Sequence, residues 1–255
     1  MQIVICCVPC SPVRAESSHR AEMVSQLLFG ERAVVLEEAA KHWIKIRCSY
    51  DGYEGWCQEG HLVNTSDIDE SSISAMVSSW KGVVDYNGTI MHVPMGSSLD
   101  GIKKSHLFWG KLTIYYKGKM IYPGKKNWGM KDVEKLAFMF LNTPYLWGGK
   151  SVFGTDCSGF TQTIFRFLNI QLLRDAWQQA TMGDSVASFD DFRPGDLAFF
   201  DNADGKITHV GILLAKNKII HASGKVRVDK ITEEGIINGD TKELTHRLKL
   251  IRRFF

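Results

Sequence analysis

The stretch Gly154-Thr-Asp-Cys-Ser-Gly-Phe160 places a cysteine where a helix is predicted to begin. After Cys157, apolar residues recur at helical spacing and predict one buried stripe, formed by Phe160, Ile164, Phe167 and Leu168. A thiol at a helix start faces the positive end of the helix dipole and free backbone N–H groups, which favour the thiolate. Because a thiolate is a ready nucleophile when a base lies nearby, Cys157 is predicted to act as a nucleophile.

Two histidines further along the chain are candidates for that base. His209 and His221 flank a predicted hairpin whose turn lies around Ala215–Asn217. If the hairpin folds about residue 215, the two side chains are directly opposed on one face, with Cβ atoms about 4.5–5.5 Å apart. One imidazole would then act as the base, and the other would fix its tautomer and orientation. A shift of the strand register by one residue would place the two histidine side chains on opposite faces of the hairpin.

The elements around these residues follow an α+β order. Asp132 caps a predicted helix that ends before Pro144, with inward positions Val133, Leu136, Ala137, Phe140 and Leu141. A loop through Tyr145 and Trp147 leads to the helix that begins at Cys157. The predicted strands that follow are Asp196–Phe200, Ile207–Leu214, Lys218–Ala222 and Val226–Asp229. Helices followed by antiparallel strands predict helices packed on an antiparallel sheet.

The first 130 residues are predicted to be all-β. Short strands and turn signals recur, for example Trp43–Arg47, the Asp51-Gly52 turn and Tyr53–Cys57. A second strand-rich block runs from Val83 to Tyr122, after a Ser- and Asp-rich linker at Asn64–Ser79 that has room for one helical turn. This spacing is typical of small barrels.

Composition excludes several classes of protein. With 44% hydrophobic and 23% charged residues over 255 positions, the chain is neither disordered overall nor a coiled coil. Its longest uncharged stretch, Leu136–Gly149, is too short to span a membrane. A net charge of +3 is too mild to indicate nucleic-acid binding. The N-terminus resembles a strand more than an export signal, so we expect a cytoplasmic protein, with an unusual export route left open.

Five motifs in the last half of the chain together resemble the NlpC-like cysteine peptidases, papain-like enzymes that cut bacterial cell-wall peptides. The motifs are Asn142-Thr-Pro-Tyr-Leu-Trp-Gly-Gly149, Gly154–Phe160, Arg193-Pro-Gly-Asp-Leu-Ala-Phe-Phe200, Ile207-Thr-His-Val-Gly-Ile212 and Ile220-His-Ala-Ser-Gly224. Upstream, Ala21–Glu31 with Trp43 and Asp51–Trp56 resembles a bacterial SH3-like domain. That domain is similar to the one in γ-D-glutamyl-diamino-acid peptidases, which carry two before the catalytic domain.

The resemblance implies roles for individual residues. Cys157 would be the nucleophile, His209 the general base and His221 the orienting third residue. The hydroxyl of Tyr145 would face the developing oxyanion, alongside the backbone N–H of Cys157. Trp147 would form a wall of the substrate groove.

Further residues are implied to recognise the free amino end of the peptide. Asp156 and Ser158 flank the nucleophile at that end, and Tyr53 and Glu22 of the first SH3-like domain would close the pocket. A carboxylate pair would hold an α-ammonium there. Arg174 is a candidate partner for a substrate carboxylate, whereas Lys103, Lys104, Lys125 and Lys126 fit a solvated face better.

The remaining cysteines are a competing signal. Cys7 and Cys10 have C-x-x-C spacing, and Cys48 and Cys57 have the positions to face each other across the Asp51-Gly52 hairpin. All four could form a Cys₄ zinc site, but a second C-x-x-C motif is missing. The favoured interpretation is that the four cysteines are small apolar residues of the core. We therefore expect no metal and no organic cofactor.

The sequence thus predicts an α+β protein with a papain-like catalytic domain at 131–255, preceded by SH3-like β-barrels at 1–66 and 67–130. The predicted activity is that of a cysteine peptidase that cuts the γ-D-glutamyl bond to meso-diaminopimelate or L-lysine in muropeptides with a free N-terminal L-alanine. Its expected partner is that peptide, and the default oligomeric state is a monomer. Two alternatives are an endopeptidase on intact peptidoglycan in growth or division, and a catalytically idle cell-wall-peptide binding protein.

Overall fold

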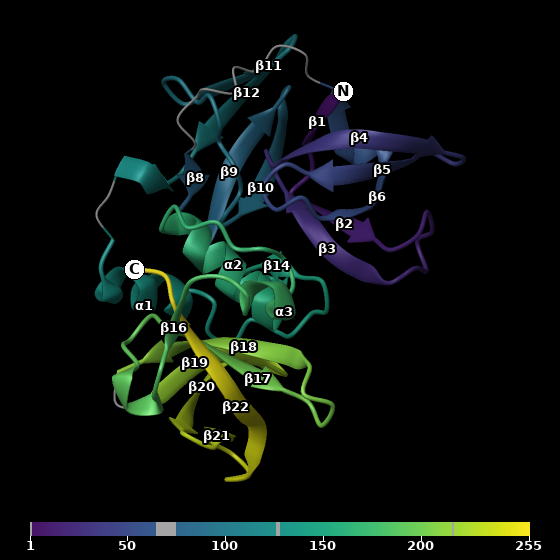
Figure 1. The fold of residues 1–255 in the computed structure, drawn as a ribbon. Coiled ribbons are helices and arrows are strands. Elements are labelled where there is room, and N and C mark those ends of the chain that lie inside the picture. The colour runs from purple at the N-terminus through teal and green to yellow at the C-terminus, as the bar shows by residue number, and fades with distance from the viewer. Residues whose placement is uncertain (1, 65–74, 126–127, 216) are drawn as a thin grey trace. The chain divides into compact units, whose positions relative to one another are not determined.

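The chain forms two compact units in the computed structural model, which describes residues 2–64, 75–125, 128–215 and 217–255. The first unit comprises Met1–Lys126 and Trp147–Phe153, and the second comprises Asn127–Leu146 and Gly154–Phe255 (Figure 1). Most of the expected linker, residues 65–74, lies outside the described residues. The boundaries of the three domains expected from the sequence stay a prediction.

The first unit is built almost entirely of strands. Its elements are β1 (Ile3–Cys6), β2 (Cys10–Arg14), β3 (Met23–Leu28), β4 (Arg32–Ala39), β5 (Trp43–Cys48), β6 (Glu54–Gln58), a 3-10 helix (Glu59–His61), β7 (Leu62–Asn64), β8 (Met76–Val77), β9 (Lys81–Tyr86), β10 (Thr89–Pro94), β11 (His106–Trp109), β12 (Leu112–Lys117), β13 (Met120–Ile121), a 3-10 helix (Pro123–Lys125) and β14 (Lys150–Ser151). Strands β1–β7 form a seven-stranded antiparallel sheet in the order β3-β2-β6-β5-β4-β1-β7.

A second sheet in this unit has the order β10-β9-β12-β11. The seven-stranded sheet encloses its own core, which includes Val13, Leu27 and Ile46. Phe29 of the first block packs instead against Trp109 of the second block, with ring centroids 5.0 Å apart. The two blocks therefore share part of their apolar core.

The second unit combines three helices with a closed sheet. Its elements are α1 (Met130–Phe138), β15 (Gly154–Thr155), α2 (Cys157–Phe167), α3 (Ala176–Gln179), β16 (Asp184–Val186), a 3-10 helix (Phe189–Asp191), β17 (Leu197–Asp201), β18 (Ile207–Leu214), β19 (Lys218–Ser223), β20 (Lys225–Thr232), β21 (Gly235–Ile237) and β22 (Leu244–Arg253). The order β22-β17-β18-β19-β20-β21 closes into a six-stranded antiparallel barrel because β21 also pairs with β22.

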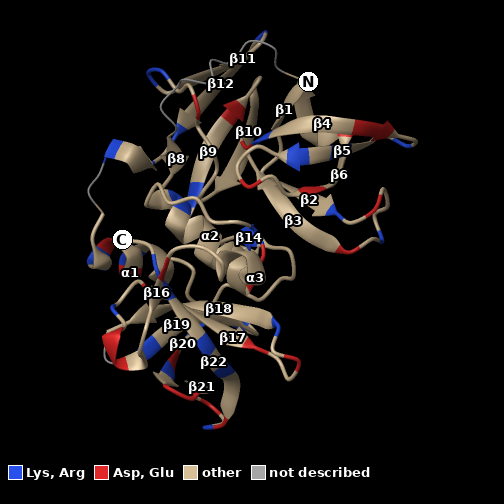
Figure 2. Ribbon diagram, in the orientation of Figure 1, with Lys and Arg blue, Asp and Glu red and all other residues tan. Residues whose placement is uncertain are grey.

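Strand β18 is buried over its last six residues, because one of its faces lines the barrel and helix α2 packs against the strand. The predicted fold class, an α+β catalytic domain preceded by SH3-like β-structure, is confirmed. Among the described residues, no helix combines the length and the apolar character that crossing a membrane requires. Figure 2 shows basic and acidic residues interspersed along the ribbon of both units.

One detail of the first predicted helix is wrong. Phe140 is buried as expected, but Leu141 is 40% exposed. Helix α1 ends at Phe138, so the helical period that would turn Leu141 inward does not continue to this residue.

Candidate functional site

Cys157 is the first residue of helix α2, as the sequence predicts. Asp156 caps the helix, because its Oδ1 accepts a hydrogen bond of 2.7 Å from the backbone N–H of Gly159. The cysteine Sγ lies 4.0 Å from the carbonyl oxygen of Thr208, the residue before His209. The start of α2 is therefore held against the strand that carries the predicted base.

The thiol of Cys157 is protonated at rest. Burial raises its pKa to about 12, and the charge of Asp156 acts in the same direction. Backbone N–H groups and Arg174 lower the pKa by less. The helix start favours the thiolate, as the sequence predicts. However, the loss of solvation raises the pKa of the thiol by more than the helix start lowers it.

The two predicted histidines are in direct contact. His209 Nε2 lies 2.8 Å from His221 Nδ1, and the rings are nearly perpendicular. The expected direct cross-strand opposition is wrong, because His221 pairs with Gly211 and not with His209. The histidines are instead diagonal neighbours, and a register difference of two residues keeps them on one face.

Gly211 makes room for this contact. A Cβ atom at this position would lie 2.8 Å from the Cβ of His221 and 2.8 Å from Cδ1 of Ile219. The ring of His221 can therefore reach along the strand toward His209, because its cross-strand partner has no side chain.

Asp229 of β20, which was not among the site residues predicted from the sequence, continues the hydrogen-bond chain beyond the two histidines. Its Oδ2 lies 3.1 Å from His221 Nε2, and both side chains are 1% exposed. Burial would raise the pKa of Asp229, but hydrogen bonds from His221, Gly239 and Arg227 outweigh it and hold the pKa at about 2. The side chain is therefore a carboxylate at neutral pH.

This carboxylate fixes the tautomers of both rings. Because Asp229 can only accept, His221 donates its Nε2–H and keeps a lone pair on Nδ1. His209 then donates its Nε2–H to that lone pair, and its own Nδ1 is left unprotonated. The network thus sets His209 up as a base through Nδ1.

A third histidine, which was not predicted from the sequence, stacks on His209. The ring of His246 in β22 lies 4.2 Å from that of His209, at 30° between planes. Burial lowers the pKa of His209 well below its usual value, and the charges of His221 and His246 add to this effect. Burial likewise lowers the pKa of His246 to about 4. Both His209 and His246 are therefore neutral near pH 7.

Tyr145 lies in the same unit, in the loop before β15. Its backbone N–H donates to Gly224 O at 2.9 Å, and it forms an isolated bridge with Thr155. Burial raises the pKa of its hydroxyl, and Cys157 and Asp156 act in the same direction. The hydroxyl keeps its proton and can donate a hydrogen bond.

Asp156 and Ser158 share a buried partner, Arg174, which is 2% exposed. The two guanidinium Nη atoms donate to the two carboxylate oxygens of Asp156 at 3.1 and 2.6 Å, and Nη1 also donates to Ser158 Oγ at 3.0 Å. The guanidinium therefore neutralises the carboxylate of Asp156, the group that the resemblance implies would bind the substrate ammonium. Arg174 is thus an internal partner of the helix cap.

Trp147 and Glu22 are brought together within the first unit. Trp147 Nε1 donates to Glu22 Oε1 at 2.6 Å. Next to it, Gly148 has φ +76°, and a Cβ there would lie 2.3 Å from Met23 O. Lys150, nearly buried, pairs with the buried Glu31 at 3.3 Å. Residues 147–153 are therefore firmly attached to the strands of the first unit.

Tyr53, the other residue predicted from the first SH3-like domain, is half-buried in the same unit. It packs against the core of the seven-stranded sheet. Its backbone N–H donates to Asp51 Oδ1 at 3.0 Å, which closes the Asp51-Gly52 turn.

Comparison with known proteins identifies the family. The family model described as bacterial dipeptidyl-peptidase Sh3 domain matches residues 13–62, and the NlpC/P60 family model matches residues 142–243. The chain is 31% identical over 214 residues to a gamma-D-glutamyl-L-lysine dipeptidyl-peptidase of Bacillus subtilis (strain 168), covering 78% of this chain and 71% of the relative. The chain belongs to the NlpC/P60 family.

Two further comparisons cover nearly the whole NlpC/P60 chain. Dipeptidyl-peptidase 6 of Lysinibacillus sphaericus is 24% identical over 251 residues, which is 86% of this chain and 88% of the relative. The crystal structure of an NlpC/P60 family protein from Bacillus cereus ATCC 10987 superposes with a TM-score of 0.82 at 19% identity, covering 98% of this chain and 99% of that one. The second similarity shows that the fold is shared over both units.

The other cysteines of this NlpC/P60 protein are free thiols. Cys57 pairs with Ile44 in the β5–β6 ladder, so the expectation that it faces Cys48 is wrong. Burial raises the pKa of Cys10 to about 12 and that of Cys57 to about 11. Over the described parts of the chain, no group of three or more His, Cys, Asp or Glu side chains is arranged to hold a metal ion.

Proposed function

We propose that this NlpC/P60 peptidase hydrolyses the γ-D-glutamyl–diamino acid bond of muropeptides that begin with a free L-alanine. The relay from Asp229 through His221 to His209, beside a buried thiol, is the observation that carries the chemistry. The names of the relatives, gamma-D-glutamyl-L-lysine dipeptidyl-peptidase and dipeptidyl-peptidase 6, support the choice of bond.

In the proposed reaction, both partners are neutral before the peptide arrives, since burial disfavours the thiolate and the imidazolium alike. As the γ-carbonyl carbon approaches, the proton of Cys157 Sγ moves to His209 Nδ1 and the S–C bond forms. The imidazolium keeps its Nε2–H on His221, and the carboxylate of Asp229 compensates the new charge.

The remaining steps return the site to its resting state. The oxyanion accepts hydrogen bonds from the Tyr145 hydroxyl and the backbone N–H of Cys157. When it collapses, the C–N bond breaks and the amine of the diamino acid leaves with the proton from His209. Water then gives a proton to His209 and attacks the thioester. This releases L-Ala-γ-D-Glu and restores the thiol.

Free-amine recognition is assigned to the carboxylate of Glu22. The carboxylate of Asp156 is compensated by Arg174, so it contributes little net charge toward an ammonium. Glu22 is an exposed carboxylate that binds Trp147 through Oε1. We propose that Glu22 both holds Trp147 and supplies the negative charge for the α-ammonium.

The test compares L-Ala-γ-D-Glu-L-Lys, its meso-diaminopimelate counterpart and the N-acetylated form of each. We expect dipeptide release from the free amines, at least about 100-fold slower cleavage of the acetylated peptides, and none with Cys157→Ala. Equal cleavage of the acetylated peptides would contradict the free-amine assignment and favour action on intact peptidoglycan. Dipeptide release by Cys157→Ala would contradict the proposed nucleophile.

Glu22→Gln separates the two functions proposed for Glu22. The amide oxygen still accepts from Trp147 Nε1, but the negative charge is lost. We expect KM for the free-amine peptide to rise at least about tenfold in Glu22→Gln while kcat changes little. An unchanged KM would leave Glu22 as a support for Trp147 alone. The cytoplasmic location and the monomeric state expected from the sequence stay predictions.

A further inference from the structure

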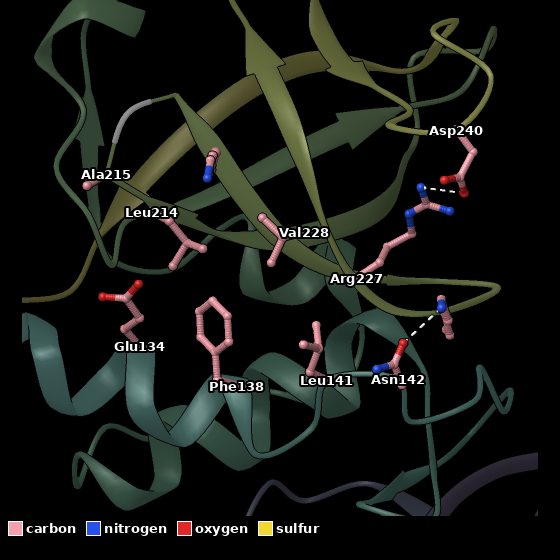
Figure 3. Close-up of a pocket in the computed structure, with 11 residues that line it drawn as sticks. Glu134, Phe138, Leu141, Asn142, Leu214, Ala215, Arg227, Val228 and Asp240 are labelled. Carbon is pink, nitrogen blue, oxygen red and sulfur yellow. Dashed lines mark hydrogen bonds and ion pairs between the residues drawn. The ribbon is translucent and has the colours of Figure 1, made fainter.

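A pocket of about 640 Å³ lies in the second unit, apart from the residues assigned to the reaction (Figure 3). Helix α1 and the residues after it form one side, and strands β18 to β20 form the other. Its lining residues are Glu134, Phe138, Leu141, Asn142, Leu214, Ala215, Lys218, Lys225, Arg227, Val228 and Asp240. The volume is within the range of small-molecule sites.

The middle of the pocket is apolar. Figure 3 shows Phe138 and Leu141 rising from the helix side toward Leu214 and Val228 of the sheet. Phe138 is 41% exposed and Leu141 is 40% exposed, although both are large apolar side chains. An apolar group of a ligand would remove this surface from water, which is favourable in proportion to the area covered.

Two cationic side chains, Lys225 and Arg227, lie at one end of the pocket, and Arg227 is paired with Asp229 and Asp240. Lys225 Nζ donates to the neutral amide oxygen of Asn142 at 2.8 Å. Arg227 Nη2 pairs at 2.9 Å with Asp240, whose side chain is 79% exposed. An exposed carboxylate contributes little net binding energy because water competes for it. A ligand carboxylate can therefore take its place between Lys225 and Arg227, with its apolar part along Phe138 and Leu141.

We propose that this pocket binds a small carboxylic acid with a short apolar tail. The apolar middle and the cationic end lie in line, so one ligand satisfies both. The pocket contains none of the residues that react with the peptide, and the proposal goes beyond the proposed function. Arg227 also contacts Asp229, with Nε 2.8 Å from Oδ2, so it is left unchanged in the variants below.

The test is a titration of the full chain followed by protein NMR and calorimetry. The probes are 4-phenylbutyrate, hexanoate and the uncharged 4-phenyl-1-butanol. We expect the phenyl acid to bind at least about tenfold more tightly than the alcohol, and this preference to weaken with added salt. Equal binding of the acid and the alcohol would overturn the proposal, as would the absence of binding at about 10 mM acid.

Two variants locate the site, and a third is the control. Leu141→Ser and Lys225→Gln should each weaken 4-phenylbutyrate at least about fivefold. Leu244→Ser removes a leucine of the same exposure, 40%, away from the pocket, and should leave the affinity unchanged. Unchanged affinity in both pocket variants would overturn the proposal.

Hydrolysis of the muropeptide is measured in the same variants. Leu141→Ser and Lys225→Gln are expected to retain it, because neither residue belongs to the Cys157–His209 network. Loss of ligand binding and loss of hydrolysis are therefore separate results, and one proposal can fail while the other stands.

Discussion

Replacing Asp229 by asparagine should reverse the donor and acceptor roles along the chain from residue 229 through His221 to His209. The positions of the side chains should stay the same. Oδ1 of Asp229 accepts from Gly239 N–H at 2.9 Å and from Arg227 Nη2 at 3.0 Å. An asparagine oxygen is best placed there, because both of these contacts are hydrogen bonds, whereas Arg227 Nε lies 2.8 Å from Oδ2 without forming one. Its NH₂ group would then occupy the Oδ2 position and point at His221 Nε2.

The inversion passes along the two rings. His221 would have to accept on Nε2 and carry its proton on Nδ1, and His209 would then accept on Nε2 and carry its proton on Nδ1. The nitrogen meant to receive the Cys157 proton would already hold one. Restoring the reactive order breaks the hydrogen bond between the asparagine and His221 and leaves two buried donors, the asparagine NH₂ and His221 Nε2–H, facing each other. At about 1.5–2 kcal/mol for each unsatisfied donor, the cost is about 3–4 kcal/mol in total. At about 1.4 kcal/mol per tenfold change, kcat should fall by about 10² to 10³.

The assay measures kcat on L-Ala-γ-D-Glu-L-Lys together with the alkylation rate of the Cys157 peptide by iodoacetamide, followed by mass spectrometry. Both rates should fall in Asp229→Asn, with little change in KM. Asp240→Asn is the matched control, since Asp240 is an exposed carboxylate on the same guanidinium, and it should keep both rates within about threefold. A folded Asp229→Asn protein with wild-type rates would refute the tautomer argument.

Three other changes test separate parts of the site. Gly211→Ala places a Cβ 2.8 Å from that of His221 and should displace the His221 ring. We expect kcat on the same peptide to fall at least about tenfold while the far-ultraviolet circular dichroism spectrum is unchanged. An unchanged kcat would contradict the need for a close approach of His221 to His209. Arg174→Met leaves the carboxylate of Asp156 buried without its ion pair and should lower the free energy of unfolding by about 3–5 kcal/mol in urea titrations; a loss below about 1 kcal/mol would contradict the pairing. His209 and His246 have lowered pKa values, so they take up protons when the chain unfolds below about pH 6.5, and stability falls as pH falls. His246→Phe should reduce this slope by about 1 kcal/mol per pH unit between about pH 6 and pH 4, whereas an unchanged slope would show that His246 is protonated in the folded protein.

The sequence was sufficient for the features that depend on short-range patterns. The position of Cys157 at a helix start was predictable because the apolar stripe that follows it is a local signal. His209 and His221 share a face because strand periodicity is two, which tolerates the two-residue error in register. The exact pairing depended on the turn length, which the pattern around Ala215–Asn217 did not define.

Features that depend on a third element were not predicted. Asp229 reaches His221 through the β19–β20 pairing, in which His221 is opposite Arg227 and Asp229 is a diagonal neighbour. Its spacing from Arg227 on one face of the strand was the signal that could have found it. Burial raises the pKa of the Cys157 thiol, in opposition to the helix dipole, and burial depends on the whole fold.

The position of Trp147–Phe153 also lay beyond sequence reasoning. These residues follow the first predicted helix in the chain, yet they belong to the first compact unit. The contacts responsible are the hydrogen bond from Trp147 to Glu22 and the ion pair of Lys150 with Glu31, each more than 100 positions apart in sequence. Isolated charges such as Glu22 and Lys150 give no local signal of such pairing.

The most direct test of the central claim is to trap the acyl-enzyme. The protein is mixed with L-Ala-γ-D-Glu-L-Lys, quenched in acid within the first turnover and digested, and the Cys157 peptide is weighed by mass spectrometry. The account predicts an added L-Ala-γ-D-Glu group on Cys157, lost on further incubation and accumulating in step with released lysine. Lysine release with an unmodified Cys157 peptide, or the same release from Cys157→Ala, would contradict it.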